Sequence, residues 1–174
     1  MPLNVEIKAR CADPSAVRKY LLDHDARFLG TDHQVDTYFQ VPRGRLKLRQ
    51  GNIENALIHY DRPDQEGPKS SKVTLFPVTE GDTLCHLLDH ALGIWAVVDK
   101  QREIYFIRNV KFHIDTVKGL GGFVEIEAID KDGSISQNAL EKDCRFYMHA
   151  FGIGDEDLLS KSYSDMLVFS NDTN

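Results

Sequence analysis

Several features that mark particular protein classes are scarce in this chain of 174 residues. The three cysteines, Cys11, Cys85 and Cys144, lie far apart, and without a CxxC pair they support neither a zinc knuckle nor a redox motif. No apolar run approaches membrane-spanning length, and the first residues lack the apolar segment of a signal peptide. We therefore expect a cytoplasmic protein with reduced thiols and no membrane partner.

An excess of basic residues is also absent. The net charge of -6 argues against a general binder of nucleic acids or anionic membranes, although it leaves room for a local basic pocket. Repeats and low-complexity segments are missing too. A hydrophobic content of 41% is ordinary for a globular protein, so we expect one domain over residues 1–170, as a monomer or homodimer, with a frayed tail at 171–174.

Alternating and helical patterns predict about eight strands and three main helices. No regular strand–helix–strand alternation is present, which argues against a parallel sheet and favours an antiparallel sheet or barrel with helices packed outside. The predicted fold class is thus α+β and mainly β. We expect the stretch 63–71 to be a loop and 155–160 and 163–169 to be short helices. The expected strands are 2–10, 33–41, 45–50, 55–62, 72–78, 95–107, 110–117 and 123–130, and the helices 13–26, 80–92 and 136–151.

The informative feature is strict alternation of charged and apolar residues along several of these strands. In the first strand, Glu6 and Lys8 alternate with Val5 and Ile7, so the strand has one charged face and one apolar face. Similar charged faces occur on four later strands. They consist of Arg45, Lys47 and Arg49; Lys100 and Arg102; Lys111, His113 and Asp115; and Glu125 and Glu127.

Two arrangements of these charged faces are open. In an open sheet they would face water, which is the ordinary antiparallel pattern. In a closed barrel they would point into the lumen, where an unpaired charge costs several kcal/mol, about 3 or more. A lumen with many bases and a few acids would suit a polyanion held by Arg and Lys, with the acids suited to a divalent cation.

Taken in order, these segments resemble the CYTH, or triphosphate tunnel metalloenzyme, superfamily. NVEIKAR is similar to its ExExK signature, and HQVDTYFQV followed by GRLKLRQ is similar to its second and third strands. HYDRPDQEGPKSS, KQREIYF, KFHIDTVKGLGGFVEIEAI and KSYSDML extend the resemblance over nearly the whole chain, particularly to its class IV adenylate cyclase branch. The resemblance implies an eight-stranded antiparallel barrel that forms a tunnel.

The resemblance also implies a site. A small-molecule triphosphate would lie in the tunnel, with Mg²⁺ or Mn²⁺ held by acidic residues. The implied metal ligands are Glu6, Asp115, Glu125 and Glu127. The implied phosphate-binding residues are Lys8, Arg45, Lys47, Arg49, Arg62, Lys69, Lys100 and Arg102, of which Lys8, Arg49, Lys100 and Arg102 would be catalytic.

Three functions follow from this resemblance. The first is conversion of ATP to cyclic AMP and pyrophosphate, and the second is hydrolysis of tripolyphosphate or thiamine triphosphate. The third is binding of a polyphosphate or nucleotide without catalysis. It arises because Asn4 stands where the signature has its first Glu, and the loss of a carboxylate should weaken binding of a divalent ion.

Other motifs point to sites less strongly. His86 and His90 have a metal-binding spacing on a helix, but a solvated helix face is the simpler interpretation. The stretch KGLGG lacks the GK[ST] ending of a phosphate-binding loop, so we expect a β-turn. His113 is expected to line the tunnel rather than transfer protons. For Tyr38 and Tyr60, the sequence leaves open whether they line the tunnel or pack beneath it.

Overall fold

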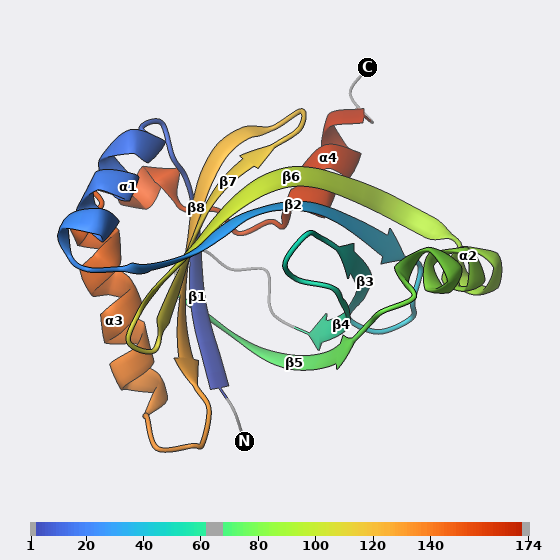
Figure 1. Ribbon diagram of the computed structural model, residues 1–174, viewed down its shortest axis with the longest axis horizontal. Coiled ribbons are helices and arrows are strands. Elements are labelled where there is room, and N and C mark those ends of the chain that lie inside the picture. The colour runs from blue at the N-terminus through green and yellow to red at the C-terminus, as the bar shows by residue number, and fades with distance from the viewer. Residues whose placement is uncertain (1–2, 62–67, 172–174) are drawn as a thin grey trace.

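Eight strands close into an antiparallel barrel in the computed structural model, which describes residues 3–61 and 68–171, without the side chains of 69–72. The order around the barrel is β1-β5-β4-β3-β2-β6-β7-β8, and β8 pairs again with β1 (Figure 1). The predicted mainly β fold is therefore confirmed. The strands are β1 (Leu3–Arg10), β2 (Arg27–Phe39), β3 (Arg45–Gln50), β4 (Ala56–Asp61), β5 (Lys69–Pro77), β6 (Ile94–Ile107), β7 (Val110–Val117) and β8 (Gly121–Asp130).

The helices begin where capping residues stand in the sequence. Asp13 accepts a hydrogen bond from the Ala16 N–H, and Pro14 opens the first helix. Ser136 caps the third helix in the same way, by accepting from the Ala139 N–H. The helices are α1 (Pro14–Asp23), α2 (Gly81–Leu92), α3 (Gln137–Ala150) and α4 (Tyr163–Asn171), with a 3-10 turn at Asp155–Asp157.

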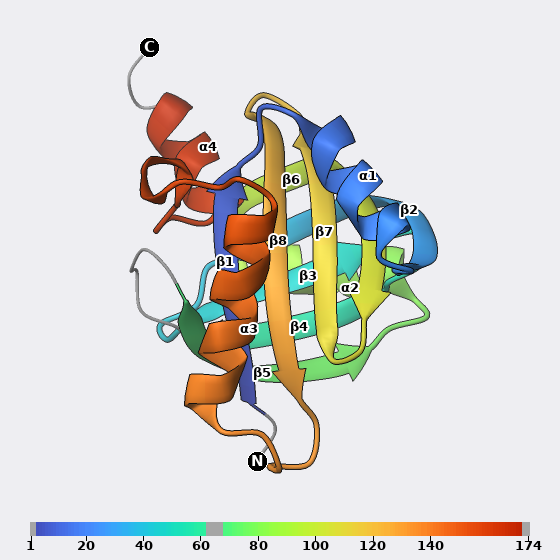
Figure 2. The ribbon, with the colours of Figure 1, turned by 90° about the vertical axis from the view of Figure 1, so that its left-hand side faces the viewer.

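The larger hydrophobic core lies outside the barrel, between its wall and two helices. Figure 2 shows α3 lying across the outer faces of β1 and β8, with α1 beside it. Their apolar side chains meet those of β1, β7 and β8, and Phe112, Ile7 and Ile126 are fully buried there. Because the apolar faces point outward to these helices, the charged faces of the same strands point into the lumen.

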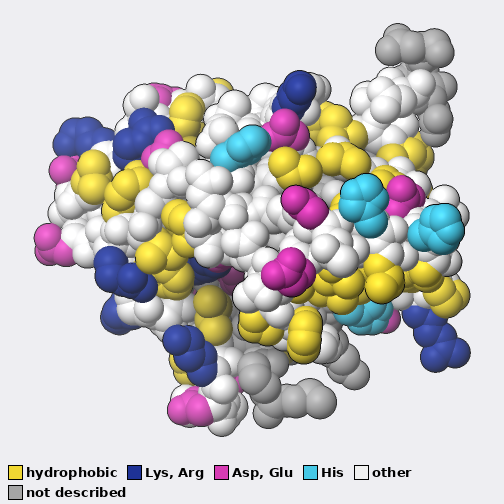
Figure 3. All heavy atoms as spheres, turned by 45° about the vertical axis from the view of Figure 1, so that its right-hand side comes forward, with side chains coloured by type: hydrophobic (Ala, Val, Ile, Leu, Met, Phe, Trp, Pro, Cys, Tyr) yellow, Lys and Arg dark blue, Asp and Glu magenta, His cyan; other side chains and the backbone are white. Residues whose placement is uncertain are grey.

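The helix α2 departs from the expected arrangement. The sequence indicated that three helices cover the barrel, but α2 lies at the end opposite α1 and α3 and buries none of its residues (Figure 1). Figure 3 shows hydrophobic side chains along the lower part of this side of the molecule. Leu87 on α2 and Val97 on β6 are both about half exposed, at 59% and 49%.

Two strands begin three or more residues earlier than their patterns indicate. β2 starts at Arg27 rather than at residue 33, and its pairing with β6 shifts register between Phe28 and Gly30. β5 starts at Lys69, inside the expected loop, because Glu6 on β1 pairs with it there. Residues 62–67 of that loop and 172–174 of the expected tail lie outside the described residues. Along the described part of the chain, every helix is too short or too polar to cross a membrane.

Candidate functional site

A cavity of about 450 Å³ occupies the barrel lumen, and charged side chains line much of it. Its volume is within the range of pockets that bind small molecules. Lysines and arginines enter it from β1, β3, β6 and β7, and acids enter from β1, β2, β8 and the β3–β4 turn. The basic lining residues are Lys8, Lys47, Arg49, Lys100, Arg102 and Lys111.

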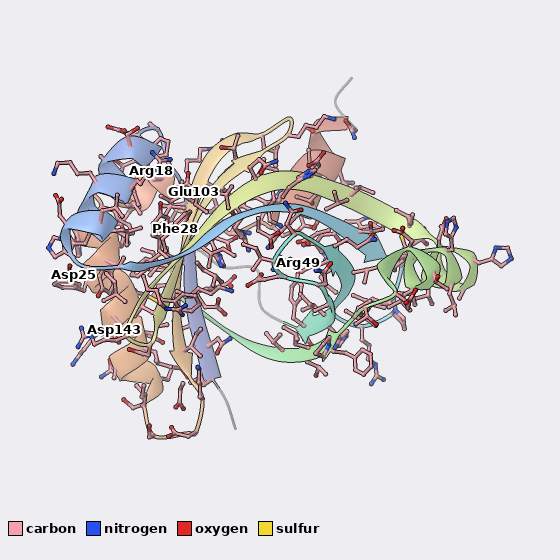
Figure 4. All side chains as sticks on the ribbon, viewed as in Figure 1. Arg18, Asp25, Phe28, Arg49, Glu103 and Asp143 are labelled. Carbon is pink, nitrogen blue, oxygen red and sulfur yellow. The ribbon has the colours of Figure 1, made fainter. Side chains whose placement is uncertain are left out.

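Asp36 on β2 organises the first group of bases. Its two carboxylate oxygens accept hydrogen bonds from Nε and Nη2 of Arg49, both at 2.8 Å. The same carboxylate accepts from Nζ of Lys100 at 2.8 Å and Nζ of Lys47 at 3.1 Å. Burial alone would raise the pKa of Asp36, but Arg49, Lys100 and Lys47 hold it well below its usual range. One buried anion therefore fixes three cations on a single side of the cavity (Figure 4 labels Arg49 inside the ring of strands).

A second group forms around Arg102 on β6. Its guanidinium donates two hydrogen bonds to Asp115, at 2.7 and 2.6 Å, and a third to Glu125 at 3.0 Å. Nζ of Lys8 lies 3.5 Å from Oε1 of Glu125, and the hydroxyl of Tyr163, at the start of α4, donates a hydrogen bond to Asp115. Arg102 and Lys8 hold the pKa of Glu125 well below its usual range against the effect of burial.

Burial changes the charge state of Lys100. Removal of its ammonium from water, together with Arg102, Arg49 and Lys47 nearby, lowers the pKa of Lys100 to about 7, although Asp36 opposes the change. Burial and the same kind of repulsion lower the pKa of Lys8. The amine of Lys100 therefore titrates near neutral pH, and an anion placed beside it would favour its charged form.

The acids implied as metal ligands all lie along the lumen or its wall, on β1, β7 and β8. Glu6 and Glu127 stand directly opposite each other in the pairing of β1 with β8. Asn4 donates from Nδ2 to Glu127 at 2.9 Å, and burial raises the pKa of Glu127. Carboxylate oxygens are the ligands that Mg²⁺ and Mn²⁺ prefer, so the residue types at this position fit such a metal. The raised pKa of Glu127 indicates that the bases nearby do not fully offset its desolvation. Among the described residues, no three acids, histidines or cysteines already form a metal-binding cluster. Asp115 and Glu125 form ion pairs with Arg102.

Other residues implied by the resemblance lie outside this centre. Arg45 does not line the cavity; it binds Asp165 of α4 at 3.1 Å, and its guanidinium lies 4.7 Å from the ring centre of Trp95. Lys69 belongs to β5 opposite Glu6, but its side chain is not described. Arg62 lies outside the described residues.

The sequence reasoning missed three participants, Asp36, Glu54 and Asp32. Asp36 stands in the quoted segment HQVDTYFQV, and its alternation with Gln34 and Tyr38 could have placed it on the inner face. Glu54 lies in the β3–β4 turn and binds Arg49 at 3.1 Å and Lys111. Glu54 is not part of an alternating strand pattern, so the sequence does not indicate that its side chain enters the cavity.

Asp32 fixes this turn from the wall of the barrel. Its carboxylate accepts from the backbone N–H groups of Ile53 and Glu54, at 2.9 and 3.0 Å, and from Gln34 at 2.8 Å. Asp32 is fully buried, and a side chain at Gly51 would meet its carboxylate at 2.6 Å. The turn is therefore held closely enough to keep Glu54 against the bases.

The weaker motifs behave as expected where the structure describes them. His86 and His90 are exposed on α2, and KGLGG contains the turn at residues 118–120 and the first two residues of β8, with positive φ at Gly119 and Gly121. His113 lines the cavity, as do Tyr38 and Tyr60. Nδ1 of His113 bonds Glu125 at 3.0 Å, and burial lowers the pKa of His113 to about 4, so the ring is neutral near pH 7.

Comparison with known proteins agrees with this geometry. The profile of the CYTH domain matches residues 2–163. The chain belongs to the CYTH family. This membership confirms the family that the charged strands resemble.

Individual relatives cover nearly the whole chain. It is 25% identical to a Methanocaldococcus jannaschii protein named "Putative adenylate cyclase", over 94% of this chain and 98% of that one. A Pyrococcus horikoshii protein superposes with a TM-score of 0.78 at 24% identity, over 93% and 98% of the two chains. A Hippeastrum protein, described as a "Putative adenylyl cyclase" with a dominant triphosphatase activity, superposes with a TM-score of 0.59 at 18% identity, over 97% and 96% of the two chains. These two structural likenesses extend to the fold alone.

Proposed function

We propose that this CYTH protein is a divalent-metal-dependent enzyme that breaks a phosphoanhydride bond of a triphosphate. Conversion of ATP to cyclic AMP and pyrophosphate is the leading reaction. The observation that carries the proposal is the cluster of bases on Asp36, namely Arg49, Lys100 and Lys47, in a cavity that Lys8, Arg102 and Lys111 also line. A cavity without a charged ligand would not need this many charges, because each charge removed from water must be paired to be tolerated.

The bases hold and stabilise the phosphates. Arg49 and Arg102 present planar guanidiniums, which match phosphate oxygens two at a time, and their acidic partners keep those groups in place before substrate arrives. Lys8 and Lys100 add point charges beside them. As the anhydride bond breaks, negative charge grows on the leaving oxygens, and cations that are already held in place stabilise it without reorganising. Arg62 and Lys69 remain predicted contributors, and Arg45 is a weaker candidate because it faces α4.

Glu6, Glu125 and Glu127 are proposed to hold the metal, with Asp115 as a further acid. Bound there, Mg²⁺ or Mn²⁺ would supply positive charge to the phosphate oxygens. To free Glu125 and Asp115 for a metal, incoming phosphates must take over their bonds with Arg102 and Lys8. Asn4 places a neutral amide against Glu127, where the signature would place a carboxylate in addition to that of Glu6.

The competing reactions share this site and differ in the nucleophile. In a cyclase, the ribose 3′-hydroxyl attacks the α-phosphorus, and pyrophosphate carries away the electron pair of the broken bond. In a triphosphatase, water attacks the terminal phosphorus. The triphosphatase activity ascribed to the Hippeastrum neighbour motivates the second candidate, hydrolysis of tripolyphosphate or thiamine triphosphate. Binding without turnover is the third, because of Asn4.

One assay separates these functions. The protein is incubated with ATP, tripolyphosphate or thiamine triphosphate, each with Mg²⁺ or Mn²⁺, and cyclic AMP and phosphate are followed. Formation of cyclic AMP supports the cyclase. Release of phosphate from tripolyphosphate or thiamine triphosphate supports the triphosphatase, and binding without product supports a non-catalytic binding protein. Glu127→Ala and Arg49→Ala should each abolish or severely reduce activity, whereas Lys19→Ala, on the exposed side of α1, should leave it unchanged. Full activity in both site variants would refute the assignment.

A further inference from the structure

One wall of the same cavity is apolar. It is formed where β4 and β5 pair, because Ile58 stands opposite Leu75 and Ala56 stands opposite Pro77, so their side chains share the inner face. Val73 and the turn residue Ile53 complete the surface, and all line the cavity. The charged side chains of β1 and β3 flank this wall, and those of β6, β7 and β8 lie farther around the barrel.

The outer part of this wall is open to solvent. Ile58 is 7% exposed, but Val73, Leu75 and Ile53 are exposed by 45%, 59% and 39%. Within the described residues, β5 pairs with β1 through Lys69, Ser70 and Ser71, and residues 73–77 continue past that pairing beside β4. Figure 1 shows β5 running away from β1 along this edge. Val73, Leu75 and Ile53 therefore form an apolar rim at a cavity mouth.

The apolar rim is continuous with the phosphate-binding group, which is our name for Lys47, Arg49 and Lys100 around Asp36. Lys47 on β3 stands opposite Ile58 on β4, and Ile58 stands opposite Leu75 on β5. Two strand spacings, or roughly 10 Å, therefore separate the Lys47 and Leu75 positions on the wall. A molecule with phosphates among the bases could place a ring at this distance on the apolar rim. Inorganic tripolyphosphate has no atoms that would cover those side chains.

We infer that the substrate is an organic triphosphate whose planar, largely apolar ring packs on the apolar rim of Ile53, Val73 and Leu75. The inference rests on the proposed function, since the phosphates must lie among Lys47, Arg49 and Lys100. It adds a specificity surface to that site and selects organic triphosphates over the inorganic chain. Because an apolar contact is non-directional, it would increase the affinity for a ligand with a ring but would not distinguish rings by their hydrogen-bonding groups.

Adjacent residues of β5 provide a matched test. Leu75 faces the cavity, whereas Phe76 is 66% exposed and does not line it. Dissociation constants of ATP, thiamine triphosphate and tripolyphosphate are measured by calorimetry with Mg²⁺ for wild type, Leu75→Ser, Val73→Ser and Phe76→Ser. Melting temperatures establish that each variant is folded.

Wild type should bind ATP or thiamine triphosphate about tenfold more tightly than tripolyphosphate, because burying a few apolar groups contributes a factor of this size. Leu75→Ser and Val73→Ser should each reduce that preference about fivefold without changing tripolyphosphate binding, and Phe76→Ser should change neither. Equal or tighter binding of tripolyphosphate by wild type, or an unchanged preference in both rim variants, overturns the inference while the proposed function stands. No binding of any triphosphate would overturn both.

Discussion

Lys100 links the charge of the cavity to the arrival of substrate. Its pKa of about 7 means that much of its amine is neutral at pH 8 in the free protein, although Asp36 lies 2.8 Å away. A phosphate beside Lys100 favours its charged form and therefore raises this pKa. Triphosphate affinity should accordingly fall as pH rises through about 7, since the protonated amine is the form that binds.

The measurable consequence is proton uptake on binding. At pH 8, where the terminal phosphate (pKa about 6) is itself ionised, tripolyphosphate should bind with uptake of a fraction of one proton, up to about one. Calorimetry in buffers with different ionisation enthalpies measures this uptake. Lys100→Met should remove it, and Lys19→Met, on an exposed side chain, should not. Identical enthalpies in all buffers for wild type would contradict the assignment.

Asn4 sets the strength of the proposed metal site. Its amide is within hydrogen-bonding distance of Glu127, so Asn4→Glu would place a second carboxylate beside that acid. Because Mn²⁺ affinity rises with the number of charged oxygen ligands, we expect the dissociation constant to fall about tenfold, with unchanged or increased turnover. Asn4→Gln adds no charge and serves as the control. If Asn4→Glu alters neither affinity nor turnover, Asn4 is not near the metal.

At the scale of elements, a paired charge fastens α1 to the outside of the barrel. Arg18 donates to both carboxylate oxygens of Glu103 on β6, at 2.9 and 2.6 Å, and Tyr105 donates to the same group (Figure 4). Arg18→Ala should lower the free energy of unfolding by about 1 kcal/mol at pH 7, because the pair is bidentate but partly exposed. Lys19→Ala, whose pair with Asp23 is exposed, should cost much less.

The pH dependence of this loss follows from Glu103. The Arg18 hydrogen bond lowers the pKa of Glu103 below its unfolded value, so the pair stabilises the fold above that unfolded value, near 4.3. The stabilisation is lost as pH falls through the folded pKa. Denaturant titrations of wild type and Arg18→Ala should therefore converge as pH falls below the folded pKa of Glu103. A difference that persists undiminished in acid would show that packing, not charge, causes the effect.

Elements with regular alternation could be predicted from sequence, and irregular ones could not. The charged strands β1, β3, β7 and β8 follow their patterns closely. The first residues of β2 do not follow an alternating pattern. The pairing of β2 with β6 shifts register between Phe28 and Gly30, and Gly30 has φ +146°. A side chain at Gly30 would meet Ile53. Membership of Glu54 in the site depends on how Asp32 folds the β3–β4 turn, which is a contact between distant residues. Such contacts form only when the barrel closes.

For the whole molecule, the balance of charge in the lumen couples phosphate to metal. The described cavity lining has six basic side chains and five acidic ones, so the bases are largely neutralised before substrate enters. A triphosphate brings roughly four further negative charges near neutral pH. A divalent cation on the acids would offset them, and the two ligands should therefore bind cooperatively.

This coupling is measurable as a dependence of affinity on metal. We expect tripolyphosphate to bind at least about tenfold more weakly in EDTA than in Mg²⁺ at pH 8, since the acids then repel the phosphates. Ionic strength is matched with NaCl, which screens charge without occupying the acids. Equal affinities in the two conditions would mean that the carboxylates do not take up a metal with the substrate.

The most direct test of the central claim is calorimetric titration of tripolyphosphate, with Mg²⁺, into wild type and Arg49→Ala. The side chain of Arg49 is fixed on Asp36 and faces the cavity, so its removal leaves a gap in the centre of the phosphate-binding group. Wild type should bind, and Arg49→Ala, shown to be folded by its melting curve, should bind about a hundredfold more weakly. Absence of binding by wild type, or equal binding by the folded variant, would contradict the assignment of the barrel lumen as a triphosphate site.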